Sequence, residues 1–71
     1  MKLHYYPETD SLYIELSPRA SVDSKEVAPG LVADFDQEGN VVGFDIDRAS
    51  TKLDLHTLEA DSLPTSRVRV A

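Results

Sequence analysis

With 71 residues and a mass of 7.9 kDa, the chain has room for one small domain and not for two. It contains no cysteine, which excludes disulfides, thiolate metal sites and cysteine nucleophiles. Thirteen acidic residues against seven Lys and Arg give a net charge of −6, so direct binding to nucleic acid is not expected. No apolar run has the length of a signal peptide or a membrane span, and we expect a soluble, cytoplasmic protein.

Alternation of apolar and polar residues predicts five strands, at residues 2–6, 11–16, 23–28, 31–36 and 41–47. The four-residue connections 7–10 and 37–40 are rich in turn-forming residues, so each is expected to close a hairpin.

The hairpin loops also predict the register of the strands. In the first hairpin, Tyr5 falls opposite Leu12, and Leu3 falls opposite Ile14. In the second, the same counting sets Phe35 opposite Val42, Ala33 opposite Phe44 and Leu31 opposite Ile46. Apolar residues meet in every pair, as expected when one face of a sheet is buried.

The middle strand is the most polar, because Val27 is its main apolar residue. A strand with so little to bury is expected at the edge of the sheet or as a short connector. Pro29 and Gly30 then supply a tight turn into the next strand.

After Asp47 the alternation ends, which predicts helix over about residues 49–61, with Ser50 as a candidate N-cap. Leu53 and Leu55 would lie about 200° apart on a regular helix, so one continuous helix does not bury both. We therefore expect a broken helix in which Asp54 caps a second turn. The tail, residues 65–71, is either strand-like or disordered.

Together these elements predict an α+β fold. It is an antiparallel meander of about five strands with one short C-terminal helix packed on one face. Residues 1–64 form the domain and 65–71 the tail. Such a small sheet with a helical cover is expected to leave little volume for a pocket of several hundred cubic ångströms.

The segments 5–16, 26–36 and 39–46 resemble, in their order and spacing, the small bacterial family called domain of unknown function 2283. The resemblance extends over about residues 3–64. It implies a compact sheet-and-helix domain and supplies no catalytic residue. Some members lie beside genes for small toxin-like proteins, which implies an antitoxin-like or other partner-binding role.

One motif has the spacing of a calcium-binding loop: Asp34, Asp36, Glu38 and Gly39 are followed by Asp45 at the twelfth position. An EF-hand needs a helix on each side, whereas strands are predicted here. Weak calcium binding through residues 34–45 is therefore a minor alternative, and no metal or cofactor is expected.

The first hairpin directs a set of polar and aromatic side chains away from the apolar face, and these are candidate partner-binding residues: His4, Tyr6, Tyr13 and Glu15. The competing interpretation is that they only stabilise a solvated sheet face through cross-strand pairs.

No catalytic motif is found. His4 and His56 have no partner residue in a recognised motif, and His56 is expected on the surface of the helix. The acids Asp34, Asp36, Asp45 and Asp47 could pair for acid–base chemistry, but acids on a sheet surface more often prevent aggregation. We therefore expect a protein that is not an enzyme.

Three functions follow from these features. The first is protein–protein contact, with an antitoxin-like partnership with a basic toxin as the specific form. The second is self-association as a structural homo-oligomer, including a homodimer, and the third is weak calcium binding.

Overall fold

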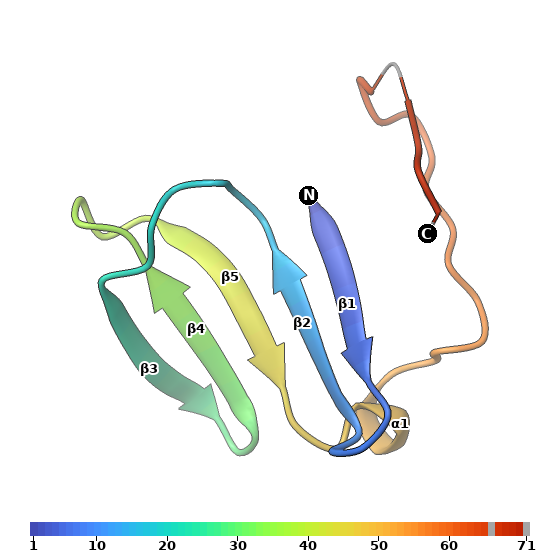
Figure 1. The fold of residues 1–71 in the computed structure, drawn as a ribbon, viewed down its shortest axis with the longest axis horizontal. Helices are drawn as coiled ribbons and strands as arrows, with labels where there is room; N and C mark the ends of the chain where they lie inside the picture. Colours follow the sequence, from blue (N-terminus) through green and yellow to red (C-terminus); the bar gives the residue numbers. More distant parts are fainter. Residues whose placement is uncertain (66, 71) are drawn as a thin grey trace.

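In the computed structural model, which describes residues 1–65 and 67–70, the chain forms one sheet and a single turn of helix (Figure 1). The five strands of this part are β1 (Lys2–Tyr6), β2 (Ser11–Glu15), β3 (Asp23–Ala28), β4 (Leu31–Phe35) and β5 (Val41–Ile46). The helix α1 is Ala49–Lys52. All five predicted strands are confirmed, each within one residue of its predicted ends.

The sheet is antiparallel throughout, with the strand order β1-β2-β5-β4-β3. A simple meander is therefore wrong, because β2 pairs with β5 and the chain crosses from β2 to β3 at one end of the sheet (Figure 1). This order joins the two apolar hairpins directly: Leu12 lies opposite Ile46, and Ile14 lies opposite Phe44. The polar strand β3 is left at the edge, as predicted.

The predicted register is confirmed in the first hairpin, where Tyr5 pairs with Leu12 and Leu3 with Ile14. In the second hairpin it holds for Ala33 with Phe44 and for Leu31 with Ile46. The predicted pairing of Phe35 with Val42 is wrong. A register shift between Asp34 and Phe35 places Val41 opposite Phe35, as a β-bulge does when it inserts one unpaired residue.

Few side chains of the described residues are well buried. Leu12, Ile46 and Ala49 form the core cluster, with Leu12 only 7% exposed, and Ile14 and Leu31 pack against it. No large side chain among the described residues is completely enclosed. The sheet is therefore a single layer whose apolar side is only partly covered.

The helix is much shorter than predicted and does not form a cover across the sheet. It lies at one end of the strands, where Ala49 joins the core cluster (Figure 1). The prediction of helix beyond Lys52 is wrong, because Leu53 already has extended backbone angles (φ −127°, ψ 151°). Arg48, not Ser50, occupies the N-cap position, and its side chain makes no capping bond.

Residues 53–65 and 67–70 continue without regular structure. The described part of the tail forms no strand, and residues 66 and 71, which the predicted tail includes, lie outside the described residues. Within the described residues, no helix is both long enough and apolar enough to cross a membrane.

Candidate partner-binding groove

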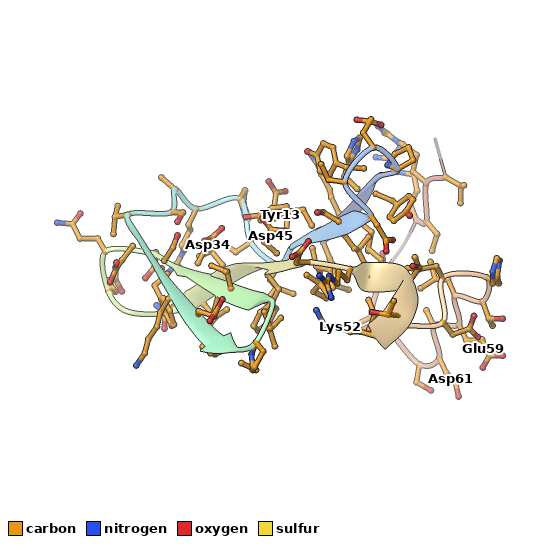
Figure 2. All side chains as sticks on the ribbon, turned by 90° about the horizontal axis from the view of Figure 1, so that it is seen from below. Tyr13, Asp34, Asp45, Lys52, Glu59 and Asp61 are labelled. Carbon is orange, nitrogen blue, oxygen red and sulfur yellow. The ribbon has the colours of Figure 1, made fainter. Side chains whose placement is uncertain are left out.

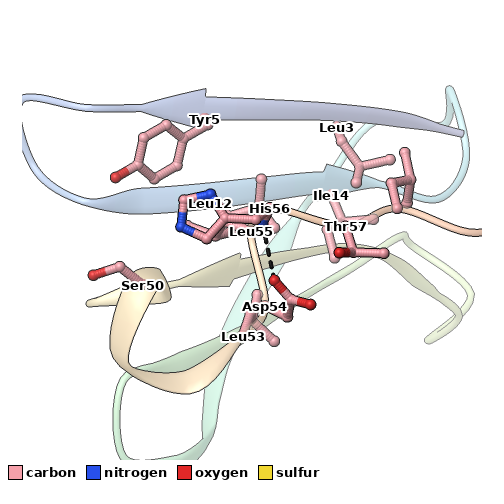
Figure 3. Close-up of a pocket in the computed structure, with 11 residues that line it drawn as sticks. Leu3, Tyr5, Leu12, Ile14, Ser50, Leu53, Asp54, Leu55, His56 and Thr57 are labelled. Carbon is pink, nitrogen blue, oxygen red and sulfur yellow. Dashed lines mark hydrogen bonds between the residues drawn. The ribbon is translucent and has the colours of Figure 1, made fainter.

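An open groove of about 700 Å³ lies between the apolar side of the first hairpin and the segment that follows α1 (Figure 3). The expectation of little pocket volume is therefore wrong. Side chains of β1 and β2 form one wall, and the segment 53–58 with Ser50 forms the other. The lining is mostly apolar: Leu3, Tyr5, Leu12, Ile14, Leu53, Leu55 and Leu58.

Several apolar side chains of the groove remain largely exposed to solvent. Leu3 is 47% exposed, Tyr5 is 40% exposed and Leu58 is 76% exposed. Each completely buried leucine contributes about 1.5–3 kcal/mol to folding, so these residues contribute only part of what they could. A second surface that closed the groove would recover the remainder.

The groove exists because the chain leaves the helix at Leu53. A continuing helix would send Leu53 and Leu55 to opposite sides, whereas in the irregular segment both line the groove. Asp54 fixes the turn, since its carboxylate accepts a hydrogen bond of 3.0 Å from the backbone N–H of His56 (Figure 3). Asp54 thus caps a turn, as predicted, but the turn is not helical. His56 lies in the groove wall and not on a helix surface.

The polar groups at one end of the groove bond to each other. Asp10 accepts hydrogen bonds from the Ser50 hydroxyl at 2.6 Å and from the Tyr5 hydroxyl at 2.8 Å. The Ser50 bond, followed by the Tyr5 bond, lowers the pKa of Asp10, and the same Asp10 bond raises the pKa of Tyr5. Ser50 thus donates to the Asp10 carboxylate, and the Asp54 carboxylate accepts a bond that stabilises a turn. The contacts of these residues are therefore structural and form no nucleophile–base relay.

The segment after α1, whose residues 53–58 line the groove, is acidic. The segment 53–63 contains Asp54, Glu59 and Asp61 and no Lys or Arg. Glu59 and Asp61 project into solvent beyond α1 (Figure 2). The groove therefore has a mostly apolar lining with acidic residues beside it.

The predicted binding residues lie on the opposite side of the sheet, where Tyr13, Asp34 and Asp45 are grouped (Figure 2). His4 pairs with Tyr13 across the strands as predicted, and the rings of His4 and Tyr6 lie 4.3 Å apart between centroids. His4 and Tyr6 are exposed, whereas Tyr13 and Glu15 are half-buried.

Tyr13 has a structural role that its sequence pattern did not reveal. Its ring lies over Gly43 of the neighbouring strand, where an added Cβ would approach Cζ of Tyr13 to 2.8 Å. Its hydroxyl donates to Asp34 at 3.0 Å, and the Ser24 hydroxyl donates to the same carboxylate at 2.6 Å. Burial, followed by the Asp34 bond, raises the pKa of Tyr13. The network crosses from β2 to β3 and favours a structural role for this part of the predicted patch.

The four acids of the calcium-like motif are not brought together. Asp36 is 7% exposed and accepts hydrogen bonds from the backbone N–H groups of Glu38 and Asn40, both at 2.9 Å. Arg19 adds an ion pair at 3.2 Å. The Asn40 backbone bond is the main cause that lowers the pKa of Asp36. Asp34 bonds to Tyr13, and within the described residues no three potential metal-ligating side chains cluster.

Sequence reasoning missed the groove. The sequence identifies the strand residues of the lining as apolar, but it predicts that a helix covers them. The conflict between Leu53 and Leu55 on one helix was the available signal that the cover is irregular and incomplete.

A family model matches residues 2–50, which contain all five strands and the first two residues of α1. The match ends before residues 51–64, which the resemblance in sequence had included, so the segment 53–58 lies beyond it. Comparison with the curated proteins and with the solved structures gives no match. Because the matched residues are more than half of the chain, the protein belongs to the family described as Protein of unknown function (DUF2283).

Proposed function

We propose that the protein acts by protein–protein contact and binds a basic partner in the groove between the first hairpin and segment 53–58. The observation that carries this proposal is the incompletely covered apolar side of the sheet. Exposed apolar patches bordered by polar residues are typical of interaction sites in soluble proteins.

Charge favours a partner that is basic. Asp54 lines the groove, and Glu59 and Asp61 follow the lining segment in the chain, with no Lys or Arg among residues 53–63. The whole chain has a net charge of −6. Opposite charges on two partners accelerate their encounter and disfavour acidic competitors. A small basic toxin has this chemistry, so an antitoxin-like role is the specific form of the proposal.

Contact is favoured over catalysis by the chemistry of the groove. Its lining is formed mainly by aliphatic and aromatic side chains, and at one end the Ser50 and Tyr5 hydroxyls both donate to Asp10. Such a surface offers area for burial more than it offers groups for proton transfer.

The experiment is calorimetric titration of the full chain with a short synthetic peptide in which leucine and lysine alternate at helical spacing, giving one apolar and one basic face. We expect saturable binding that weakens as salt is added. Leu55→Ser, in the groove wall, should weaken binding at least tenfold, whereas Val32→Ser, on the opposite side of the sheet, should leave it within about twofold.

A scrambled peptide of the same composition separates groove binding from simple charge attraction. Equal affinity for the scrambled and the amphipathic peptide would contradict the proposal, as would equal effects of the two serine substitutions.

A further inference from the structure

The strand β1 forms one edge of the sheet. It pairs with β2 on one side, and on its other side no described residue pairs with it, including residues 67–70 of the tail. All five of its residues are exposed. An edge strand of this kind presents unpaired N–H and C=O groups to which another strand can bond.

The opposite edge of the sheet is blunted in two ways. A register shift between Glu26 and Ala28 interrupts β3, and this strand carries Asp23, Lys25 and Glu26. Bulges and charged residues are the usual means by which proteins prevent an edge from pairing. The strand β1, in contrast, has no proline and no register shift with β2.

The charge distribution also favours β1 as the edge at which another strand could pair. Among the five strands of the described part, it is the one without Asp or Glu, and its charged residue is Lys2. The chain as a whole has a net charge of −6, so two copies repel each other over most of their surfaces. At β1 two copies approach without bringing carboxylates of that strand together.

We propose that a second copy of this chain pairs with β1 in antiparallel orientation, about a two-fold axis at His4, and so joins two sheets into one. For the backbone groups to bond and for the same faces of the two sheets to lie on one side, an even-numbered residue must lie opposite an even-numbered residue, and an odd-numbered residue opposite an odd-numbered one. The register centred on His4 is the one of this kind that pairs all five residues of the strand.

This register extends the apolar floor of the groove across the two copies. Leu3 lies opposite the partner's Tyr5 on the groove side, and Tyr5 lies opposite the partner's Leu3. On the other side Lys2 lies opposite the partner's Tyr6, whose ring face attracts a cation. The β3 edges remain at the two ends of the joined sheet, so the association closes as a dimer.

The test combines sedimentation with cross-linking, in the absence of any other protein. We expect the full chain to pass from monomer to dimer as its concentration rises from micromolar to millimolar. Because the chain has no cysteine, single substitutions report proximity directly. Residues directly opposite in antiparallel strands have Cα atoms about 4.5–5.5 Å apart, within the span of about 4.4–6.8 Å that a disulfide bridges.

Under mild oxidation, His4→Cys should form a disulfide dimer at least tenfold faster than Lys25→Cys, which places the thiol on β3. Both variants are first compared with the parent by circular dichroism to establish that they fold. A monomer at all concentrations, with equal cross-linking rates at the two positions, would overturn the proposal. Faster cross-linking of Leu3→Cys or Tyr5→Cys than of His4→Cys would overturn the register. No basic peptide is present in this experiment. A failure to dimerise would therefore contradict the pairing of β1 and would not contradict binding of a basic partner in the groove, which the peptide titration tests separately.

Discussion

Asp10 accepts hydrogen bonds from Ser50 at the start of α1, although the two residues lie 40 positions apart in the sequence. One carboxylate oxygen accepts from the backbone N–H of Ser50 at 3.1 Å, and the other accepts from the Ser50 hydroxyl at 2.6 Å. The backbone N–H of Ala49 also donates to the Asp10 carbonyl at 2.8 Å. The cap of the helix is thus supplied by the first hairpin, and the end of the groove is fixed where the hairpin and α1 meet.

The first prediction follows from this bond. Ser50→Ala removes the hydroxyl and should lower the free energy of unfolding by about 1 kcal/mol, which shifts the melting temperature of a domain of this size by about 4–8 °C. Asp10→Asn is the matched control, because asparagine also tolerates the left-handed backbone that Asp10 adopts at φ 53°. In the Asp10→Asn background the effect of Ser50→Ala should shrink. Additive losses in urea titrations of the four proteins would contradict the coupling.

The second prediction concerns Gly43 and Tyr13. Gly43→Ala should destabilise the protein by about 1–3 kcal/mol, because the new methyl group occupies space that the Tyr13 ring fills. Chemical denaturation measures this loss directly. In a Tyr13→Ala background the same substitution should cost much less. If Gly43→Ala were equally costly in both backgrounds, the close approach of the ring to the glycine would be refuted.

Much of the sheet could be predicted from the sequence, because period-two alternation and hairpin length are local properties. They gave the five strands and the pairing of Tyr5 with Leu12. The pairing of β2 with β5 could not be obtained in this way, since it depends on which hairpin edges meet across the crossover. The bulge beside Phe35 depends on backbone geometry that alternation does not encode.

The C-terminal half of the groove was the least predictable. The spacing of the leucines in this segment, Leu53, Leu55 and Leu58, fits a helix only in part. In the structure the segment forms the turn that Asp54 stabilises and no helix. The aromatic residues of the first hairpin lead the sequence to predict binding residues on the Tyr13 side, whereas the groove lies on the other side of the sheet.

The third prediction is a dependence of stability on acid. The pKa of Asp36 is lower in the folded protein than its ordinary value of 3.8, so its carboxylate stabilises the fold completely above pH 3.8. That contribution is lost as the pH falls below 3.8 through the folded-state value. Asp36→Asn should lower stability at neutral pH and should lose less stability than the parent below pH 3.8. Urea titrations at a series of pH values measure how the free energy of unfolding of each protein depends on pH. The same dependence in the parent and in Asp36→Asn would contradict the role of Asp36.

The fourth prediction compares two leucines that line the same groove. Leu12→Ala should cost about 2–5 kcal/mol, because Leu12 is 7% exposed in the core cluster. Leu58→Ala should change stability by no more than about 0.5 kcal/mol, because Leu58 is 76% exposed. Thermal and urea unfolding measure both. A loss at Leu58 as large as that at Leu12 would show that segment 53–58 closes over the sheet.

The most direct test of the groove as a binding surface is an NMR titration of the full chain with the amphipathic leucine–lysine peptide. We predict that the largest shifts occur in the methyl groups of Leu3, Leu55 and Leu58, with small changes around Tyr13 and Val32 on the other side of the sheet. Shifts concentrated around His4, Tyr6 and Tyr13, or no saturable shift at all, would contradict the account.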